Sequence, residues 1–179
     1  MNSNIFLIGY RGTGKTTVGA ILAARLGWTY VDADPFLEAK HGKSIRQMFA
    51  NEGEPVFRDR ETEVLAELAG RTHHVISTGG GVILRDVNRA VIATRGWTVW
   101  LTADAETIAR RLADDPTTGE RRPRLTKGGL DEIQELLAVR EPLYRSCADL
   151  EIDSSERSPE ALVEAILSAW NSSGSKSSG

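Results

Sequence analysis

The stretch Gly9-Tyr10-Arg11-Gly12-Thr13-Gly14-Lys15-Thr16 decides the architecture expected for this chain. It fits the pattern of a glycine, four residues and then Gly-Lys-Ser/Thr, which cradles the phosphates of a nucleotide. A short apolar run, residues 5–8, precedes it, and residues 17–26 follow with apolar side chains at helical spacing. The motif therefore stands in the strand–loop–helix setting that it needs. A glycine-rich turn that matches by chance would not supply that setting.

The residue types of this loop indicate how it would bind phosphate. Glycines let the backbone approach a ligand closely, so that several N–H groups and the positive end of the following helix point inward. Lys15 is expected on the β- and γ-phosphates, and the Thr16 hydroxyl on Mg²⁺. The residues expected to bind the phosphates of ATP are Gly12, Thr13, Gly14, Lys15, Thr16 and Thr17.

Composition places the chain among ordinary globular proteins. It has 179 residues, of which 40% are hydrophobic and 26% charged, and these values suit one domain with a real core. A net charge of −3 gives no reason to expect a nucleic-acid or membrane surface. We expect residues 1–171 to form a single monomeric, cytoplasmic domain and residues 172–179, rich in Ser and Gly, to be disordered. The single cysteine, Cys147, excludes an internal disulfide.

Strand-like and helix-like segments alternate along the whole chain. This alternation predicts an α/β fold, with a five-stranded parallel sheet and helices on both faces. The expected strands are residues 5–8, 29–34, 74–78, 97–101 and 149–153. The expected helices are residues 17–26, a helix from residue 35, and residues 44–49, 55–69, 85–95, 105–112, 130–144 and 159–170.

Two acids end the second expected strand. Residues two apart on a strand share a face, so Asp32 and Asp34 are expected to point together toward the ligand crevice at the carboxyl edge of the sheet. Pro35 suits the first position of the following helix. The structural alternative is that one of the aspartates only caps that helix.

Two further groups are candidates for the same crevice. Arg58 and Glu61 are three apart and share one helical face, although such pairs are usually solvated. The third strand runs into Gly79-Gly80-Gly81, a run that suggests either positive φ angles or close backbone approach. No aspartate ends this strand, so Asp32 is the acid we expect to support Mg²⁺ beside Thr16.

Residues 113–127 are polar and rich in turn-forming residues, and they contain the cluster Arg121-Arg122-Pro123-Arg124. A solvated loop is one explanation. With a phosphate site already in place, a mobile lid that closes arginines over phosphates is the explanation we favour.

In its motifs the chain resembles the shikimate kinases from residue 5 to about residue 170. The matching pieces are residues 9–19, Asp32-Ala33-Asp34, Phe57-Arg58 with Glu61, Gly79-Gly80-Gly81, Arg122-Pro123 and Arg140 with Leu143-Tyr144. The resemblance implies a P-loop fold like that of nucleoside monophosphate kinases. It also implies transfer of the ATP γ-phosphate to the 3-hydroxyl of shikimate, a step of aromatic amino acid biosynthesis.

The resemblance also implies residue roles. Shikimate would be bound by Asp34, Arg58, Gly79, Gly80, Gly81 and Arg140. Arg122 would close from the lid onto the phosphates, and Arg110, Arg157 and Pro159 would flank the adenine. Lys15, Asp34 and Arg122 would be the catalytic residues. The lid departs from the family in being long and in having Arg124 where the family usually has Leu.

Two other functions are left open by the residues. A kinase for another small polyol acid, such as gluconate, would use the same kind of site. A nucleotide-dependent switch would need a partner surface, and the sequence contains no coiled coil or basic patch that suggests one.

Overall fold

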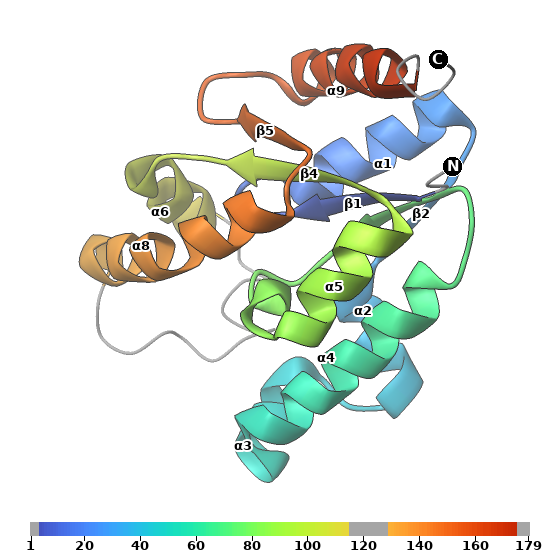
Figure 1. Ribbon diagram of the computed structural model, residues 1–179. Helices are drawn as coiled ribbons and strands as arrows, with labels where there is room; N and C mark the ends of the chain where they lie inside the picture. Colours follow the sequence, from blue (N-terminus) through green and yellow to red (C-terminus); the bar gives the residue numbers. More distant parts are fainter. Residues whose placement is uncertain (1–3, 115–128, 175–179) are drawn as a thin grey trace.

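A central parallel sheet with helices packed against both faces organises the molecule (Figure 1). The computed structural model describes residues 4–114 and 129–174. The five strands are β1 (Asn4–Ile8), β2 (Thr29–Asp32), β3 (His74–Ser77), β4 (Trp97–Thr102) and β5 (Leu150–Asp153). They lie in the order β2-β3-β1-β4-β5, and each neighbouring pair is parallel. The predicted five-stranded parallel sheet is confirmed.

Helices fill the connections between the strands, as the alternation predicts. They are α1 (Lys15–Leu26), α2 (Ala33–His41), α3 (Ile45–Glu52), α4 (Glu54–Ala69), the short 3-10 helix η1 (Val82–Leu84), α5 (Asp86–Arg95), α6 (Ala105–Asp114), α8 (Gly129–Cys147) and α9 (Pro159–Gly174). Ser44 caps α3, since its hydroxyl accepts a hydrogen bond from the backbone N–H of Gln47. Within the described residues, no helix is both long and apolar enough to span a membrane.

Strand β1 lies in the middle of the sheet and contributes to the core on both faces. Ile5 and Leu7 pack with α1 and α9 on one face, whereas Phe6 and Ile8 pack with α2 to α5 and α8 on the other. All four side chains are fully buried. A strand covered on both faces carries a continuous apolar run instead of an alternating one, and residues 5–8 have that pattern.

The boundary between β2 and α2 corrects one expectation. The strand ends at Asp32, and Asp34 lies in the first turn of α2. Asp32 is the helix cap, because its Oδ1 accepts the backbone N–H of Asp34 at 3.1 Å. The prediction that both acids share a strand face is therefore wrong. Asp32 instead has two roles, as cap and as a neighbour of the phosphate loop.

The last helix is longer than the sequence indicates. Helix α9 continues to Gly174, so the first residues of the tail expected to be disordered are helical. The Ser172 hydroxyl donates a hydrogen bond to the Ser168 carbonyl, and the Ser173 hydroxyl donates one to the Trp170 carbonyl, so both satisfy acceptors near the helix end. Trp170 also anchors the helix, since its ring packs edge-on against Trp28 and Trp97. The rest of the tail lies outside the described residues.

Candidate functional site

Three neighbouring strands deliver the candidate residues to one edge of the sheet. Strand β3 lies between β1 and β2, and Ser77 at its end pairs with both Leu7 and Asp32. The loop after β1, the glycines after β3 and the cap of α2 consequently meet at the carboxyl edge. In open α/β sheets this edge is where ligands bind.

The loop after β1 has the geometry of a phosphate cradle. Gly9, Gly12 and Gly14 have φ angles of 136°, 81° and 92°, a region that favours glycine. At Gly9 a Cβ atom would also come within 2.3 Å of the Leu101 carbonyl oxygen. Helix α1 begins at Lys15 with no side chain capping it, so the N–H groups of its first turn can bind an anion.

Lys15 is held inside this loop. Its ammonium donates hydrogen bonds of 2.8 Å to the carbonyl oxygens of Gly9 and Tyr10, and the residue is only 8% exposed. The Thr13 hydroxyl also donates to the Tyr10 carbonyl, at 2.8 Å. These bonds fold the loop around a buried positive charge, which suits the binding of an anion.

Thr16 and Asp32 lie together, as the sequence predicts for a magnesium site. The Thr16 hydroxyl donates to Asp32 Oδ2 at 3.2 Å. Burial, followed by the charge of Asp34, raises the pKa of the Asp32 carboxyl above its usual value. Burial, followed by the charge of Asp32, raises the pKa of Tyr30 to about 12. A divalent cation would relieve this crowding of negative charge, so a hydroxyl and a carboxylate here fit Mg²⁺.

Mg²⁺ needs few protein ligands when phosphates supply the rest. In residues 4–114 and 129–174 there is no cluster of three or more His, Cys, Asp and Glu residues able to hold a metal. The fit to Mg²⁺ therefore depends on the Thr16–Asp32 pair.

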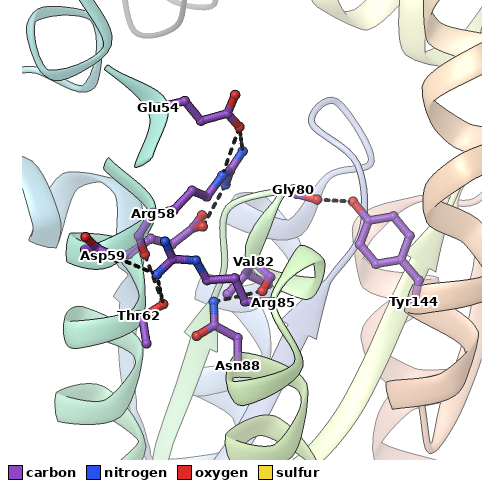
Figure 2. Close-up of polar contacts among 10 residues, drawn as sticks. Glu54, Arg58, Asp59, Thr62, Gly80, Val82, Arg85, Asn88 and Tyr144 are labelled. Atoms are coloured by element: carbon purple, nitrogen blue, oxygen red, sulfur yellow. Dashed lines mark hydrogen bonds and ion pairs between the residues drawn. The ribbon is translucent and has the colours of Figure 1, made fainter. Parts of the chain in front are cut away.

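Arg58 is buried and held by two acids from its own helix. Its Nη1 donates to Glu61 at 2.7 Å, while Nε and Nη2 donate to Glu54 at 3.2 and 3.1 Å (Figure 2). Arg58 and Glu61 are 9% and 6% exposed, so the interpretation of a solvated surface pair is wrong. The guanidinium also lies 5.1 Å from the centre of the Phe57 ring. The guanidinium is thus oriented before any ligand arrives.

Close backbone approach, rather than positive φ, explains why the run of three glycines ends in Gly81. Among the described residues, the positive φ angles fall on other glycines and on His73. A Cβ on Gly81 would come within 2.4 Å of Arg58 Nη1, and one on Gly80 would be 3.4 Å from the Gly9 carbonyl oxygen. The Gly80 carbonyl accepts a hydrogen bond from the Tyr144 hydroxyl (Figure 2). The Tyr144 ring stacks on Trp100. The loop is therefore fixed between α4, α8 and the phosphate loop.

The remaining candidates lie on α6, on α8 and just before α9. Arg140 on α8 places its guanidinium carbon 5.7 Å from the ring centre of Tyr10, a residue of the phosphate loop. Arg110 is exposed on α6, and Arg157 is exposed just before Pro159 opens α9. Arg122 and most of the expected lid lie outside the described residues.

One pair of supporting residues was missed by the sequence analysis. Arg111 donates to the Gly12 carbonyl at 3.2 Å and to the Ser154 carbonyl at 2.7 Å. The buried Ser154 hydroxyl lies 2.9 Å from the Thr13 carbonyl. These residues therefore hold the outside of the phosphate loop. No sequence signal marks this role, because it joins positions 141 residues apart.

The fold and the site together define a P-loop nucleotide-binding protein. Comparison with known proteins identifies the family: the family model "Shikimate kinase" matches residues 11–171. A shikimate kinase of Rhodopirellula baltica is 48% identical over 95% of this chain and 91% of its own. The chain belongs to the shikimate kinase family.

Solved structures agree with this assignment. A shikimate kinase from Acinetobacter baumannii in complex with shikimate superposes with a TM-score of 0.89 at 38% identity, covering 96% of this chain and 94% of that one. A gluconokinase from Sinorhizobium meliloti reaches 0.55 at 17% identity over 94% of this chain and 91% of its own. At that identity the likeness shows a shared fold and carries no argument about substrate.

Proposed function

We propose that this protein is an ATP-dependent kinase that transfers the γ-phosphate of ATP to the 3-hydroxyl of shikimate, giving shikimate 3-phosphate and ADP. The observation that carries the substrate class is Arg58. It is buried, held by Glu61 and packed against Gly81, directly beside a phosphate-binding loop. An oriented, buried guanidinium is suited to a small carboxylate, and family membership points to shikimate.

The phosphate loop would bind and position the nucleotide. Backbone N–H groups from Gly12 to Thr17 would hold the phosphates, and Lys15 would leave the Gly9 and Tyr10 carbonyls to contact the transferred group. Thr16 and Asp32 would hold Mg²⁺, which supplies positive charge to the phosphate oxygens when bound. The raised pKa of Asp32 supports this role, because burial and the charge of Asp34 outweigh the hydrogen bonds and the Lys15 charge that favour the carboxylate.

The acceptor would lie between α4, α8 and residues 79–81. Arg58 and Arg140 would bind its carboxylate, and the backbone of the three glycines would line the pocket. Asp34, in the first turn of α2, would accept a hydrogen bond from the reacting hydroxyl and orient it or take its proton.

Three further proposals remain, of which the first two follow from the resemblance. Arg110, Arg157 and Pro159 would flank the adenine, and Arg122 would close onto the phosphates from a lid at about residues 113–127. The protein would act as a monomeric single domain in the cytoplasm, where ATP is supplied. Light scattering of the purified protein tests the oligomeric state.

Turnover of ATP with different acceptors tests the proposed function. ADP release is measured with shikimate, with gluconate, with nucleoside monophosphates and with no acceptor. We expect rapid turnover with shikimate and only background hydrolysis otherwise. Faster turnover with another acceptor would identify that acceptor as the substrate in place of shikimate. Turnover without an acceptor that equals turnover with shikimate would favour a nucleotide-dependent switch.

A further inference from the structure

The two acids that hold Arg58 are unlike each other. The side chain of Glu61 is 7% exposed, and it contacts Nη1. The side chain of Glu54 is 59% exposed, and its Oε1 accepts from both Nε and Nη2. Glu61 is consequently a fixed, desolvated partner, whereas the carboxylate of Glu54 is largely in contact with solvent.

A guanidinium has two edges that can bind a carboxylate through a pair of N–H groups, the Nη1–Nη2 end and the Nε–Nη2 side. In Arg58 the end is closed by Gly81. A Cβ on this glycine would lie 2.4 Å from Nη1, 2.6 Å from Nη2 and 2.8 Å from the central carbon, which places the Gly81 backbone just beyond the two Nη atoms. An incoming carboxylate that binds Arg58 through two N–H groups must therefore use the Nε–Nη2 side.

Glu54 occupies that side. We infer that Glu54 is an internal carboxylate that competes with the carboxylate of the substrate for Arg58, and so sets the affinity of the site for carboxylated ligands. The inference rests on the proposed function, since it takes Arg58 as the residue that binds the substrate carboxylate. When the ligand binds, Glu54 leaves the Nε–Nη2 edge and turns to solvent, while Glu61 stays and keeps the guanidinium in place.

The position of Glu54 in the chain suits a group that swings away. It is the first residue of α4, directly after Gly53, whose φ is 84°. Its exposed carboxylate is solvated on leaving Arg58, so its release costs little. In the ligand-free protein Glu54 supplies a carboxylate to the Nε–Nη2 edge of the buried Arg58 guanidinium, which would otherwise lack an acceptor there.

The inference predicts opposite effects for the two acids. Replacing Glu54→Gln removes a competing charge, and Glu54→Ala removes the acceptor as well, so both should strengthen shikimate binding. Exposed ion pairs are weak, so the expected decrease in the dissociation constant is roughly twofold to fivefold. Replacing Glu61→Gln loosens Arg58 and should weaken shikimate binding.

Asp59→Asn is the matched control. Asp59 lies on the same helix, is 72% exposed and pairs with Arg85 at 2.8 Å, so this variant loses the same unit of charge from a comparable ion pair away from Arg58 (Figure 2). The Asp59→Asn variant should have the same dissociation constant for shikimate as the unmodified protein. A general loss of helix stability cannot imitate the expected result, because destabilisation weakens binding and the predicted change strengthens it.

Calorimetric titration of shikimate into each variant, alongside the KM for shikimate and for ATP, tests the inference. Tighter shikimate binding in both Glu54 variants, with the KM for ATP unchanged, is the expected result. Weaker or unchanged binding in the Glu54 variants of an otherwise active enzyme would overturn the inference alone. Absence of shikimate-dependent turnover by the unmodified protein would reject the proposed function, and this inference with it.

Discussion

Replacing Gly81→Ala tests whether substrate affinity depends on the exact placement of Arg58. The methyl carbon would lie 2.4 Å from Nη1 and 2.6 Å from Nη2, whereas non-bonded atoms rest at roughly 3.5 Å, so the guanidinium must retreat by about 1 Å. A displacement of that size away from Glu61 carries the 2.7 Å hydrogen bond between Arg58 and Glu61 past the usual limit. A displaced guanidinium also loses a charge-assisted hydrogen bond to the substrate carboxylate, which costs about 1.5–3 kcal/mol, so the KM for shikimate should rise roughly tenfold to a hundredfold.

The backbone itself tolerates this change. Gly81 has φ −99° and ψ 2°, which alanine adopts, and the lower entropy of the unfolded chain returns about 0.4–1 kcal/mol of stability. Steady-state kinetics with each substrate varied, together with thermal unfolding, provide the assay. Gly129→Ala is the control, because a Cβ there meets no atom within 4 Å. A folded Gly81→Ala enzyme with unchanged KM for shikimate, or with equal rises for both substrates, would refute the reasoning.

Other residues give independent tests. Lys15→Ala should lower kcat at least about a hundredfold, because the ammonium acts where charge develops; circular dichroism should show an intact fold. Ser154→Ala should raise the KM for ATP but not for shikimate, since its hydroxyl holds the Thr13 carbonyl, and kinetics with each substrate varied would decide it. Asp32 has a raised pKa in the folded protein, so the free energy of unfolding decreases as pH rises from its unfolded pKa through that raised value. In the absence of Mg²⁺ and at neutral pH, the Asp32→Asn variant should therefore unfold at a higher temperature than the unmodified protein, and this difference should vanish below about pH 4. The variant should also need a higher Mg²⁺ concentration for turnover. Thermal unfolding scans at several pH values test the first expectation, and Mg²⁺ titrations of the turnover rate test the second.

Local patterns were enough to predict the sheet, the helices and the phosphate loop. Each of these depends on residues close in sequence, such as the apolar run 5–8 and the glycines that follow it. The boundary at Asp34 was harder, because a proline is tolerated throughout the first turn of a helix and Pro35 does not fix where that turn begins. The sequence leaves open which of the two aspartates caps the helix, and Asp32 makes the cap.

The parts that sequence could not settle depend on distant neighbours. Arg58 and Glu61 have the spacing of any solvated helix pair. Their burial depends on the tertiary structure, in which the Gly81 backbone packs against Arg58. Arg111 and Ser154 contact the phosphate loop across most of the chain, so no local pattern marks them. Residue roles within a site of this kind follow from tertiary contacts rather than from periodicity.

The central position of β1 governs when the site can form during synthesis. This strand leaves the ribosome before both of its neighbours, since Ile5 pairs with Val75 on one side and Trp97 on the other. Until β3 has emerged, the strand that precedes the nucleotide motif is an unpaired apolar segment, the kind of surface that chaperones recognise, and its second edge stays open until β4 has emerged. Ser154 emerges later still, and only then is the Thr13 carbonyl secured. Nucleotide retention by stalled nascent chains should therefore appear late, after the fifth strand is clear of the exit tunnel.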